Sequence, residues 1–288
     1  MPEQAAAGGG RLVLVGTPIG NLGDLAPRAV EILTTADVIA AEDTRRTRAL
    51  LTHAGIRARG RLVAVHEHNE AEQAIDLAST VAGGALVAVV TDAGMPGISD
   101  PGSRLVGACA EAGLVVEVVP GPSAVLAALV VSGIAADRFT FEGFLPRKGA
   151  ERRTRVEELA ARSHTTVLFE APGRVAATLE DLAKVCGDDR RVAIARELTK
   201  VHEEVVRATL GEAVAHVGAH PPRGEHVIVL AGAPPAAPAT DAELQAAVRD
   251  ELTKGDSTRA TADRVSDRLG VSRRRAYAAV LAERGSRQ

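Results

Sequence analysis

The feature that most constrains this chain is a regular alternation between short apolar runs and longer stretches with helical spacing. The short runs are rich in Val, Leu and Ile, and the first of them begins at Leu12. This alternation is typical of α/β proteins, in which helices connect the strands of a largely parallel sheet. Strands are expected at residues 12–15, 38–40, 62–65, 86–90, 115–118, 139–141, 166–169, 192–195, 204–209 and 226–230.

Helices are expected between these strands, because apolar residues recur there every three to four positions. Asn69 is expected to cap one helix, and Gly113 is expected to end another. The expected helices cover residues 27–34, 44–54, 70–82, 103–112, a stretch after Pro122, 151–161, 174–185 and 212–217.

Breaks in the pattern predict how the chain divides into domains. Gly133 and Asp137 interrupt the alternation near the middle, so two α/β domains are expected at residues 11–134 and 135–232, after a flexible tail at residues 1–10. Residues 233–241 contain three prolines and no large apolar side chain, which is typical of a linker.

The segment after this linker, residues 242–288, is expected to form a small helical domain. Its helices are expected at residues 242–252, 257–269 and 272–284, with Ser257 and Ser272 as caps. The turn between the last two helices and the arginines that follow it resemble a helix-turn-helix. This domain can therefore contact nucleic acid, or it can serve for packing or dimerisation.

The composition, with 46% hydrophobic and 25% charged residues, is that of a soluble globular protein. No apolar run approaches the ~18 residues that a membrane span needs, and the N-terminal segment lacks the features of a signal peptide. Cys109 and Cys186 are too few and too far apart in sequence for a disulfide scaffold or a cysteine zinc site. A cytoplasmic protein without a membrane anchor is expected.

The net charge of -3 excludes a globally basic nucleic-acid binder, but two local segments are strongly basic. One is the end of the chain from Arg268. The other, residues 147–155, includes Lys148, Arg152, Arg153 and Arg155. We expect it to be an RNA-contacting loop, although such a run can also be the solvated start of a helix.

Three loops rich in Gly and Pro follow three of the expected strands, at residues 16–24, 91–102 and 120–124. Ligands of open α/β sheets bind beyond the carboxyl ends of the strands, so these loops are expected to converge on one crevice. The spacing of the glycines fits neither the dinucleotide-binding fingerprint nor a P-loop. The loops therefore predict a nucleotide-like ligand bound in another way.

The same loops carry a resemblance to the tetrapyrrole-methylase superfamily of S-adenosylmethionine-dependent transferases. Within it, the chain is similar to the branch that methylates the ribose 2′-hydroxyl of a cytidine in 16S rRNA of the small ribosomal subunit. The resemblance covers residues 11–232, and it implies two α/β domains with a cofactor cleft between them and a homodimer. Its marks are residues 16–24, 41–45, 68–69, 91–94, 99–102, 144–146 and 196–200.

The resemblance also implies which residues line the S-adenosylmethionine site. They come from the three loops and from the second domain. They are Pro18, Gly94, Met95, Ile98, Ser123, Ala124, Phe169 and His226.

The chemistry requires a ribose hydroxyl placed in line with the methyl donor and a group that removes its proton. Glu42, Asp43 and Glu197 are candidates for the base or for orienting the substrate, or they form structural ion pairs. Arg45, His68, Arg196 and Lys200 are expected to contact RNA or to orient the substrate. No metal is expected, because His66 and His68 have no third ligand at a suitable spacing.

Two alternatives to this function remain at this point. The chain can be a methyltransferase of the same fold that acts on a tetrapyrrole or another small molecule. It can also be a non-catalytic factor that binds rRNA or the ribosome and uses the cleft only structurally.

Overall fold

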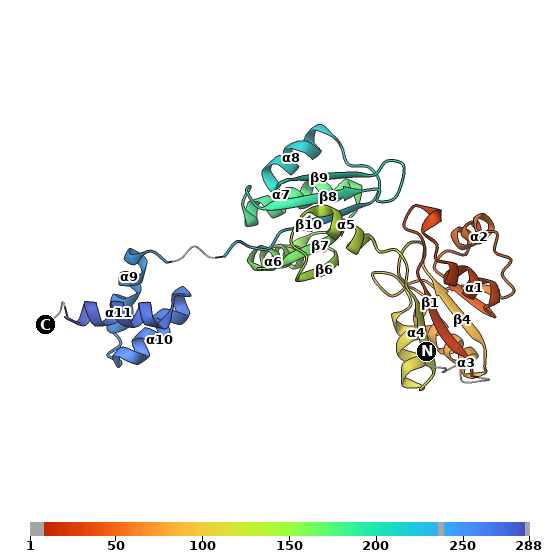
Figure 1. The fold of residues 1–288 in the computed structure, drawn as a ribbon, viewed down its shortest axis with the longest axis horizontal. Coiled ribbons are helices and arrows are strands. Elements are labelled where there is room, and N and C mark those ends of the chain that lie inside the picture. Colours follow the sequence, from red (N-terminus) through yellow and green to blue (C-terminus); the bar gives the residue numbers. More distant parts are fainter. Residues whose placement is uncertain (1–8, 236–238, 286–288) are drawn as a thin grey trace. The chain divides into compact units, whose positions relative to one another are not determined.

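The structure is a computed structural model that describes residues 9–235 and 239–285. It consists of two compact units, of which the first ends at Ala233 and the second begins at Pro234. Each unit is described by itself (Figure 1). Every strand and helix expected from the sequence is present, with ends that differ by a few residues. None of the helices in the described residues is long and apolar enough to cross a membrane.

The first sheet contains five strands in the order β3-β2-β4-β1-β5, and every neighbouring pair is parallel. Its strands are β1 (Arg11–Val15), β2 (Val38–Ala41), β3 (Arg61–Ala64), β4 (Leu86–Val90) and β5 (Val115–Val119). The two strands beside β1 are β4 and β5, so the loops that follow these three strands leave the sheet side by side. This order places the three Gly/Pro loops at one edge.

Helices cover both faces of the first sheet (Figure 1). On one face, α1 (Pro27–Thr35) and α2 (Thr44–His53) bury Leu33 and Leu51 against β1, β2 and β4. On the other face, α3 (Glu70–Ala82) and α4 (Ser103–Glu111) bury Leu77 and Leu105. Strands covered on both sides must be apolar throughout, which explains their continuous Val-rich runs.

Asn69 precedes α3, but its side chain does not cap the helix as expected. Its Oδ1 accepts a hydrogen bond from the His66 amide at 2.8 Å, and its Nδ2 donates to the Ala64 carbonyl at 3.0 Å. The predicted N-cap position is therefore confirmed, but the side chain stabilises the preceding turn and makes no capping hydrogen bond.

The second sheet has the order β6-β7-β10-β8-β9. Only β6 and β7 are parallel, and the other three pairings are antiparallel. Its strands are β6 (Phe139–Phe144), β7 (Thr165–Glu170), β8 (Arg191–Arg196), β9 (Glu204–Thr209) and β10 (His226–Leu230). The expectation of a largely parallel sheet is therefore wrong for this half. The link between β8 and β9, residues 197–203, is too short for the crossover that a parallel pair needs.

One face of the second sheet is covered by α6 (Gly149–Ala161), α7 (Val175–Cys186) and α8 (Leu210–Ala219). Its other face is covered by α5 (Ala124–Ser132), whose Val125, Ala128 and Leu129 pack against Val227 and Val229. This helix lies within the range 11–134 expected for the first domain, yet it packs on the second sheet. Judged by which sheet each element packs against, the boundary between the two α/β domains therefore lies just before α5. Two short 3-10 helices, Leu22–Asp24 and Pro172–Arg174, complete the first unit.

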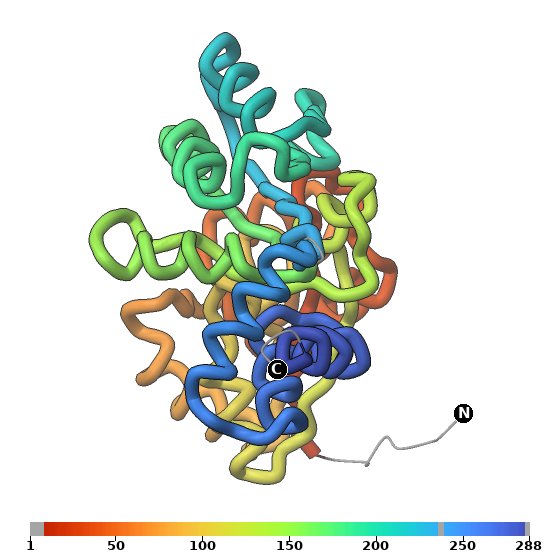
Figure 2. The backbone as a smooth tube through the Cα atoms, turned by 90° about the vertical axis from the view of Figure 1, so that its left-hand side faces the viewer, coloured from red at the N-terminus to blue at the C-terminus, as the bar shows by residue number. Residues whose placement is uncertain are grey.

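The second unit is a bundle of three helices, drawn in blue in Figure 2. They are α9 (Asp241–Leu252), α10 (Thr258–Leu269) and α11 (Arg273–Gly285). Val248, Val265 and Val280 are fully buried in its core. Ser257 and Ser272 accept hydrogen bonds from the amides of Ala260 and Arg275, which confirms both as caps.

Candidate functional site

The three Gly/Pro loops of the first sheet meet, as the sequence predicts. Thr17 and Gly94 exchange backbone hydrogen bonds of 2.9 and 3.1 Å, which join the first loop to the second. A Cβ on Gly16 would lie 2.6 Å from the Cα of Gly121 in the third loop. Only glycine permits this approach of two backbones.

A fourth segment, residues 197–200, approaches the first loop from the second sheet. The amide of Asn21 donates a hydrogen bond to Thr199 Oγ1 at 3.1 Å. A Cβ on Gly20 would lie 2.4 Å from Cγ of Lys200 and 2.8 Å from Oγ1 of Thr199. Two of the segments that carry the family resemblance therefore contact each other.

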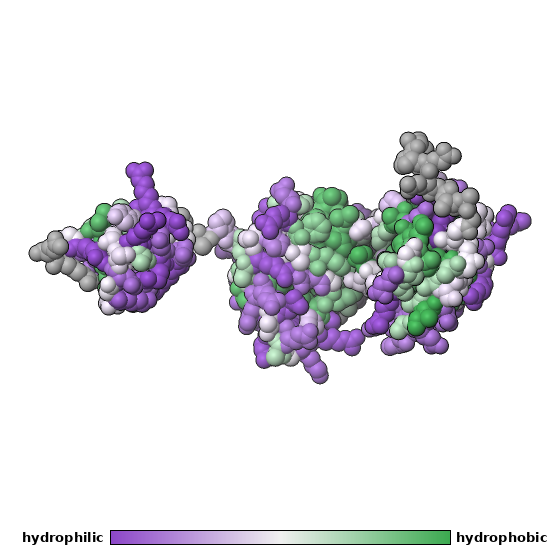
Figure 3. Space-filling model, turned by 90° about the horizontal axis from the view of Figure 1, so that it is seen from below, coloured by the Kyte–Doolittle hydropathy of each residue, from purple (hydrophilic) through white to green (hydrophobic). Residues whose placement is uncertain are grey.

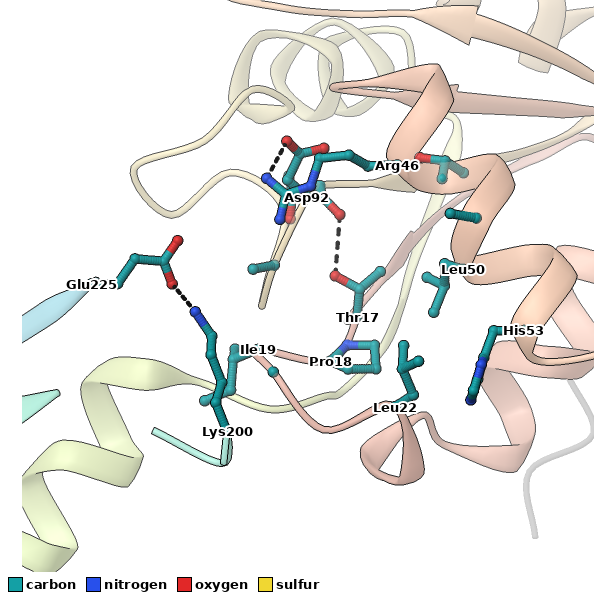
Figure 4. A pocket seen from close by; sticks show the side chains of 15 residues that line it. Thr17, Pro18, Ile19, Leu22, Arg46, Leu50, His53, Asp92, Lys200 and Glu225 are labelled. Carbon is teal, nitrogen blue, oxygen red and sulfur yellow. Dashed lines mark hydrogen bonds and ion pairs between the residues drawn. The ribbon is translucent and has the colours of Figure 1, made fainter. Parts of the chain in front are cut away.

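Between these segments and α2 lies a cavity of about 510 Å³ (Figure 4). Its walls are apolar at Pro18, Leu22 and Leu50 and polar at Arg46, Asp92 and Lys200, among other residues. Thr91 also lines it and is only 3% exposed, and its Oγ1 has no hydrogen-bond partner. A buried hydroxyl without a partner is costly, so this one is available to a ligand.

The acidic side chains at the ends of β2 and β4 fix one wall of this cavity. Asp92 accepts a hydrogen bond of 3.2 Å from the Asp43 amide and forms an ion pair of 2.9 Å with Arg46. Glu42 Oε2 accepts a hydrogen bond of 3.1 Å from the backbone amide of Asp92. Asp43 caps α2, because its side chain accepts hydrogen bonds from the backbone amides of Arg45 and Arg46. The hydrogen bond from the Arg45 amide is the main cause that lowers the pKa of the Asp43 carboxyl. A carboxylate held in this way is a weak base.

Asp100, in the second loop, is the carboxyl group with the most altered proton affinity. Burial, followed by the nearby negative charges of Glu42 and Asp92, raises its pKa to about 7. Such a group gains and loses its proton near neutral pH.

Lys200 reaches the cavity from the other side (Figure 4). Its Nζ lies 3.0 Å from Glu197 Oε1 and 2.8 Å from Glu225 Oε2. Burial alone would lower the pKa of Lys200, but the hydrogen bonds to Glu225 and Glu197 raise it, so the group stays charged. The hydrogen bond from the Glu225 amide is the largest cause that lowers the pKa of Glu197, and the hydrogen bond from Lys200 lowers it as well. Glu197 therefore positions Lys200 and is a weak base.

Arg196 and His226 lie together at the same edge of the second sheet, where they line a small cavity of about 30 Å³. Arg196 forms an ion pair of 3.6 Å with Glu204, and its buried Nε has no hydrogen-bond partner. Burial lowers the pKa of His226, whose Nδ1 lies 3.0 Å from the Gly224 carbonyl oxygen.

The residues expected at the cofactor site are distributed around the loops. Pro18 lines the 510 Å³ cavity, and Ser123 lines a neighbouring cavity of about 600 Å³ that shares Ile19 with it. Gly94 has a φ of 85°, which favours glycine, and a Cβ there would lie 3.6 Å from the Pro122 carbonyl oxygen. The remaining expected residues line neither cavity, and they are Met95, Ile98, Ala124, Phe169 and His226. Ile98 is exposed, Ala124 is the first residue of α5, and the ring of Phe169 contacts that of Phe141.

The residues expected to contact RNA differ in exposure. The Arg45 side chain is 88% exposed, and His68, Lys148 and Arg153 are also exposed. Arg155 forms ion pairs of 3.5 and 3.2 Å with Glu142 and Glu158.

Arg152 departs from the expectation for its segment, because it is only 8% exposed. Its guanidinium donates to Asp181, Thr178 and the Pro146 carbonyl at 2.9 to 3.1 Å. These contacts use the donors on all three of its nitrogens and tie α6 to α7. The structure therefore gives Arg152 a structural role in place of the expected RNA contact.

Several residues of the site were missed by sequence reasoning. Thr91, Asp92 and Asp100 belong to the second loop, whose Gly/Pro content predicts a ligand nearby but does not show which of its side chains face that ligand. Arg46 is the sequence neighbour of Arg45, which is expected to contact the substrate. The orientation of α2 about its own axis decides which of the two side chains faces the cavity. No group of three or more His, Cys, Asp and Glu in residues 9–235 and 239–285 is arranged to hold a metal ion.

Comparisons with known proteins bear on this site and its fold. The family model for tetrapyrrole (corrin/porphyrin) methylases matches residues 11–214. A Synechocystis protein is 44% identical over 270 residues, which cover 93% of this chain and 96% of its own. A Mycobacterium tuberculosis protein is 48% identical over 276 residues, 96% of each chain. Both bear the name ribosomal RNA small subunit methyltransferase I.

Solved structures share the fold at lower identity. Uroporphyrin-III C-methyltransferase from Thermus thermophilus, complexed with S-adenosylhomocysteine, matches 77% of this chain and 97% of its own with a TM-score of 0.55 and 24% identity. Cobalt precorrin-4 methyltransferase matches 77% of this chain and 94% of its own with a TM-score of 0.58 and 19% identity. These likenesses confirm the expected arrangement of two α/β halves.

Proposed function

The chain belongs to the tetrapyrrole (corrin/porphyrin) methylase family, and we propose that it transfers a methyl group from S-adenosylmethionine to the ribose 2′-hydroxyl of a cytidine in 16S rRNA. The observation that carries the proposal is the similarity to rRNA methyltransferases at 44 to 48% identity over more than nine-tenths of the chain. The similarity covers the loops that converge and the segment 197–200 that faces them.

The residues present fit the cofactor. The close contact between Gly16 and Gly121 joins the first loop to the third, and Gly94 supplies the positive φ that the second loop adopts beside them. A cavity of about 510 Å³ lies within the usual range for small-molecule sites, and the unpartnered Thr91 hydroxyl offers it a hydrogen bond. Pro18 and Ser123, which line the two neighbouring cavities, would hold the cofactor, and Gly94 and Ala124 belong to the same loops. When bound, S-adenosylmethionine supplies a methyl group that is already activated by its positive sulfur.

The remaining task of the protein is to orient the ribose hydroxyl and to take up its proton. We assign orientation to Arg46 and Lys200, whose positive charges line the cavity from opposite sides and suit a nucleotide phosphate. Both are already held, Arg46 by Asp92 and Lys200 by Glu197 and Glu225. Side chains positioned in this way lose little conformational freedom when substrate binds.

We assign proton uptake to Asp100. Its pKa of about 7 makes it a better base than Asp43 or Glu197, whose pKa values are lowered. The charge of Asp92, which lines the cavity wall, contributes to this raised pKa. A base matched to the working pH contributes about 10²- to 10⁴-fold to rate.

We further propose that the protein acts in the cytoplasm as a homodimer. Leu126 and Val130 on α5 are 52% and 77% exposed, and Val118 on the edge strand β5 is 50% exposed. Exposed apolar side chains on these two consecutive elements support an interface between copies of the chain.

The test is methyl transfer from labelled S-adenosylmethionine to small ribosomal subunits that lack the modification, followed by mapping of the nucleotide. Label on the ribose of one cytidine is expected. Binding of the cofactor without labelling of RNA would favour a small-molecule substrate. Absence of cofactor binding would favour a non-catalytic factor.

A further inference from the structure

The C-terminal unit carries a groove between α10 and α11 that the proposed reaction leaves without a role. The groove encloses about 480 Å³, and its lining includes Arg259, Asp263, Arg273, Arg274, Tyr277 and Leu281. The face of this unit seen in Figure 3 is mostly hydrophilic.

The arginines of this unit fall into two sets. Arg264, Arg268 and Arg275 join its helices through ion pairs of 2.5 to 2.8 Å with Glu251, Asp256, Asp250 and Asp241. The groove arginines are placed differently. Arg273 is 75% exposed and pairs with Asp263 at 3.2 Å, and Arg259 and Arg274 lie at the surface. An exposed pair of this kind contributes little to stability, so Arg273 can exchange Asp263 for another anion.

Tyr277 lies between these arginines and is 44% exposed. It is the single tyrosine of the chain, and it is placed where it adds little to the core of the unit. Leu281, one helical turn further along, is 50% exposed. An exposed aromatic ring among arginines offers a stacking surface for a base together with cations for the neighbouring phosphates.

We propose that this groove binds an unpaired segment of RNA, with a base on Tyr277 and phosphates on Arg273 and Arg274. The inference rests on the proposed function for the presence of RNA. An unpaired segment is specified because the major groove of an RNA duplex is too narrow to admit a helix such as α11. The groove thus supplies a docking site for the substrate that is separate from the catalytic cavity.

The test uses the full chain and protein-free small-subunit rRNA, with affinity measured over a salt series. Tyr277→Ala is expected to weaken binding roughly five- to hundredfold, the range for loss of one base stack, with little change in salt slope. Arg274→Ala is expected to lower the slope by about 0.7 to 0.9, because one phosphate contact is lost. Tyr277→Phe keeps the ring and is expected to bind like the wild type.

Arg268→Ala is the matched control, because it removes a charge from the same unit on the side that faces Asp250. Its affinity and salt slope are expected to equal those of the wild type. The proposal would be overturned if Tyr277→Ala and Arg274→Ala both bound rRNA with wild-type affinity, because the groove would then contact nothing. It would also be overturned if these variants lost affinity only for assembled subunits, because the groove would then contact protein. A wild-type protein that methylates no RNA while these variants still lose rRNA affinity would refute the proposed function alone.

Discussion

Lys200 lies so close to Gly20 that a Cβ on this glycine would be 2.4 Å from Lys200 Cγ. The contact joins the first loop of one sheet to the segment after β8 of the other. It also fixes where the Lys200 ammonium enters the cavity, beside Glu197 and Glu225. The absence of a side chain at Gly20 therefore shapes this cavity, which residues from both halves line.

Gly20→Ala is expected to displace residues 198–200 and to reduce methyl transfer about tenfold or more, because small displacements of positioning groups are costly to rate. Overpacking of this kind destabilises a protein by about 1 to 3 kcal/mol. Single-turnover methyl transfer and urea unfolding measure the two effects.

Gly107→Ala is the control, because this glycine lies within α4 and a Cβ on it would have no heavy atom within 4 Å. It is expected to keep full activity and to gain about 0.5 to 1 kcal/mol, the helix-propensity difference between Gly and Ala. Equal behaviour of the two variants would show that the contact between Gly20 and Lys200 is unimportant.

The sequence predicts the strands, the helices and the convergence of three loops because these depend on local patterns. It does not predict that β8 pairs antiparallel with both β9 and β10. The direction of a strand pairing depends on the path of the connecting chain between the two strands. Arg152 shows the same limit for side chains. Its segment is basic and polar, but its burial depends on Asp181 and Thr178 of the next helix, about 30 residues away.

The choice between Arg45 and Arg46 gives a direct test of the cavity as the substrate site. Arg46→Ala is expected to lower kcat/KM for rRNA about tenfold, corresponding to loss of one charge-assisted hydrogen bond. Arg45→Ala removes the same charge from a side chain that is 88% exposed and is expected to change kcat/KM less than Arg46→Ala does. A larger effect at Arg45 would return the substrate contact to the residue expected from the sequence.

The role proposed for Asp100 predicts that both activity and stability depend on pH. With a pKa of about 7, its base form accumulates as pH rises through neutrality, so methyl transfer is expected to rise with pH and level off above it. Asp100→Asn is expected to abolish this rise and to reduce the rate about 10²-fold or more. An unchanged pH profile in the variant would rule out Asp100 as the base.

The stability prediction follows from the same pKa. Between the ordinary aspartate pKa of 3.8 and about 7, the folded state keeps the Asp100 proton that the unfolded state has released. The free energy of unfolding therefore falls as pH rises through this window. Asp100→Asn lacks this titration, so its stability relative to the wild type is expected to improve from pH 4 to pH 7 and to stay level above that. Urea unfolding at several pH values measures the difference.

Methyl transfer is expected to survive excess EDTA. The described residues offer no set of three or more His, Cys, Asp and Glu placed to hold a metal, and the methyl donor needs no Lewis acid. The enzyme is treated with excess EDTA and freed of the chelator, and turnover is then measured on preassembled small subunits in a magnesium buffer, because RNA folding requires magnesium. Loss of turnover that zinc restores would contradict the prediction.

Arg152 and Arg153 are neighbours on α6 with opposite environments, and the pair separates a structural from a surface role. Arg152→Ala removes a buried cation and leaves Asp181 and Thr178 without their donor, so a loss of about 3 kcal/mol in the free energy of unfolding is expected. Arg153→Ala changes an exposed residue and is expected to stay within about 0.5 kcal/mol. Binding to rRNA should respond in the reverse order, with Arg153→Ala lowering the salt slope by about 0.7 to 0.9 and folded Arg152→Ala leaving it unchanged. A reduced slope for Arg152→Ala, measured where the variant is fully folded, would place this arginine back on the RNA surface.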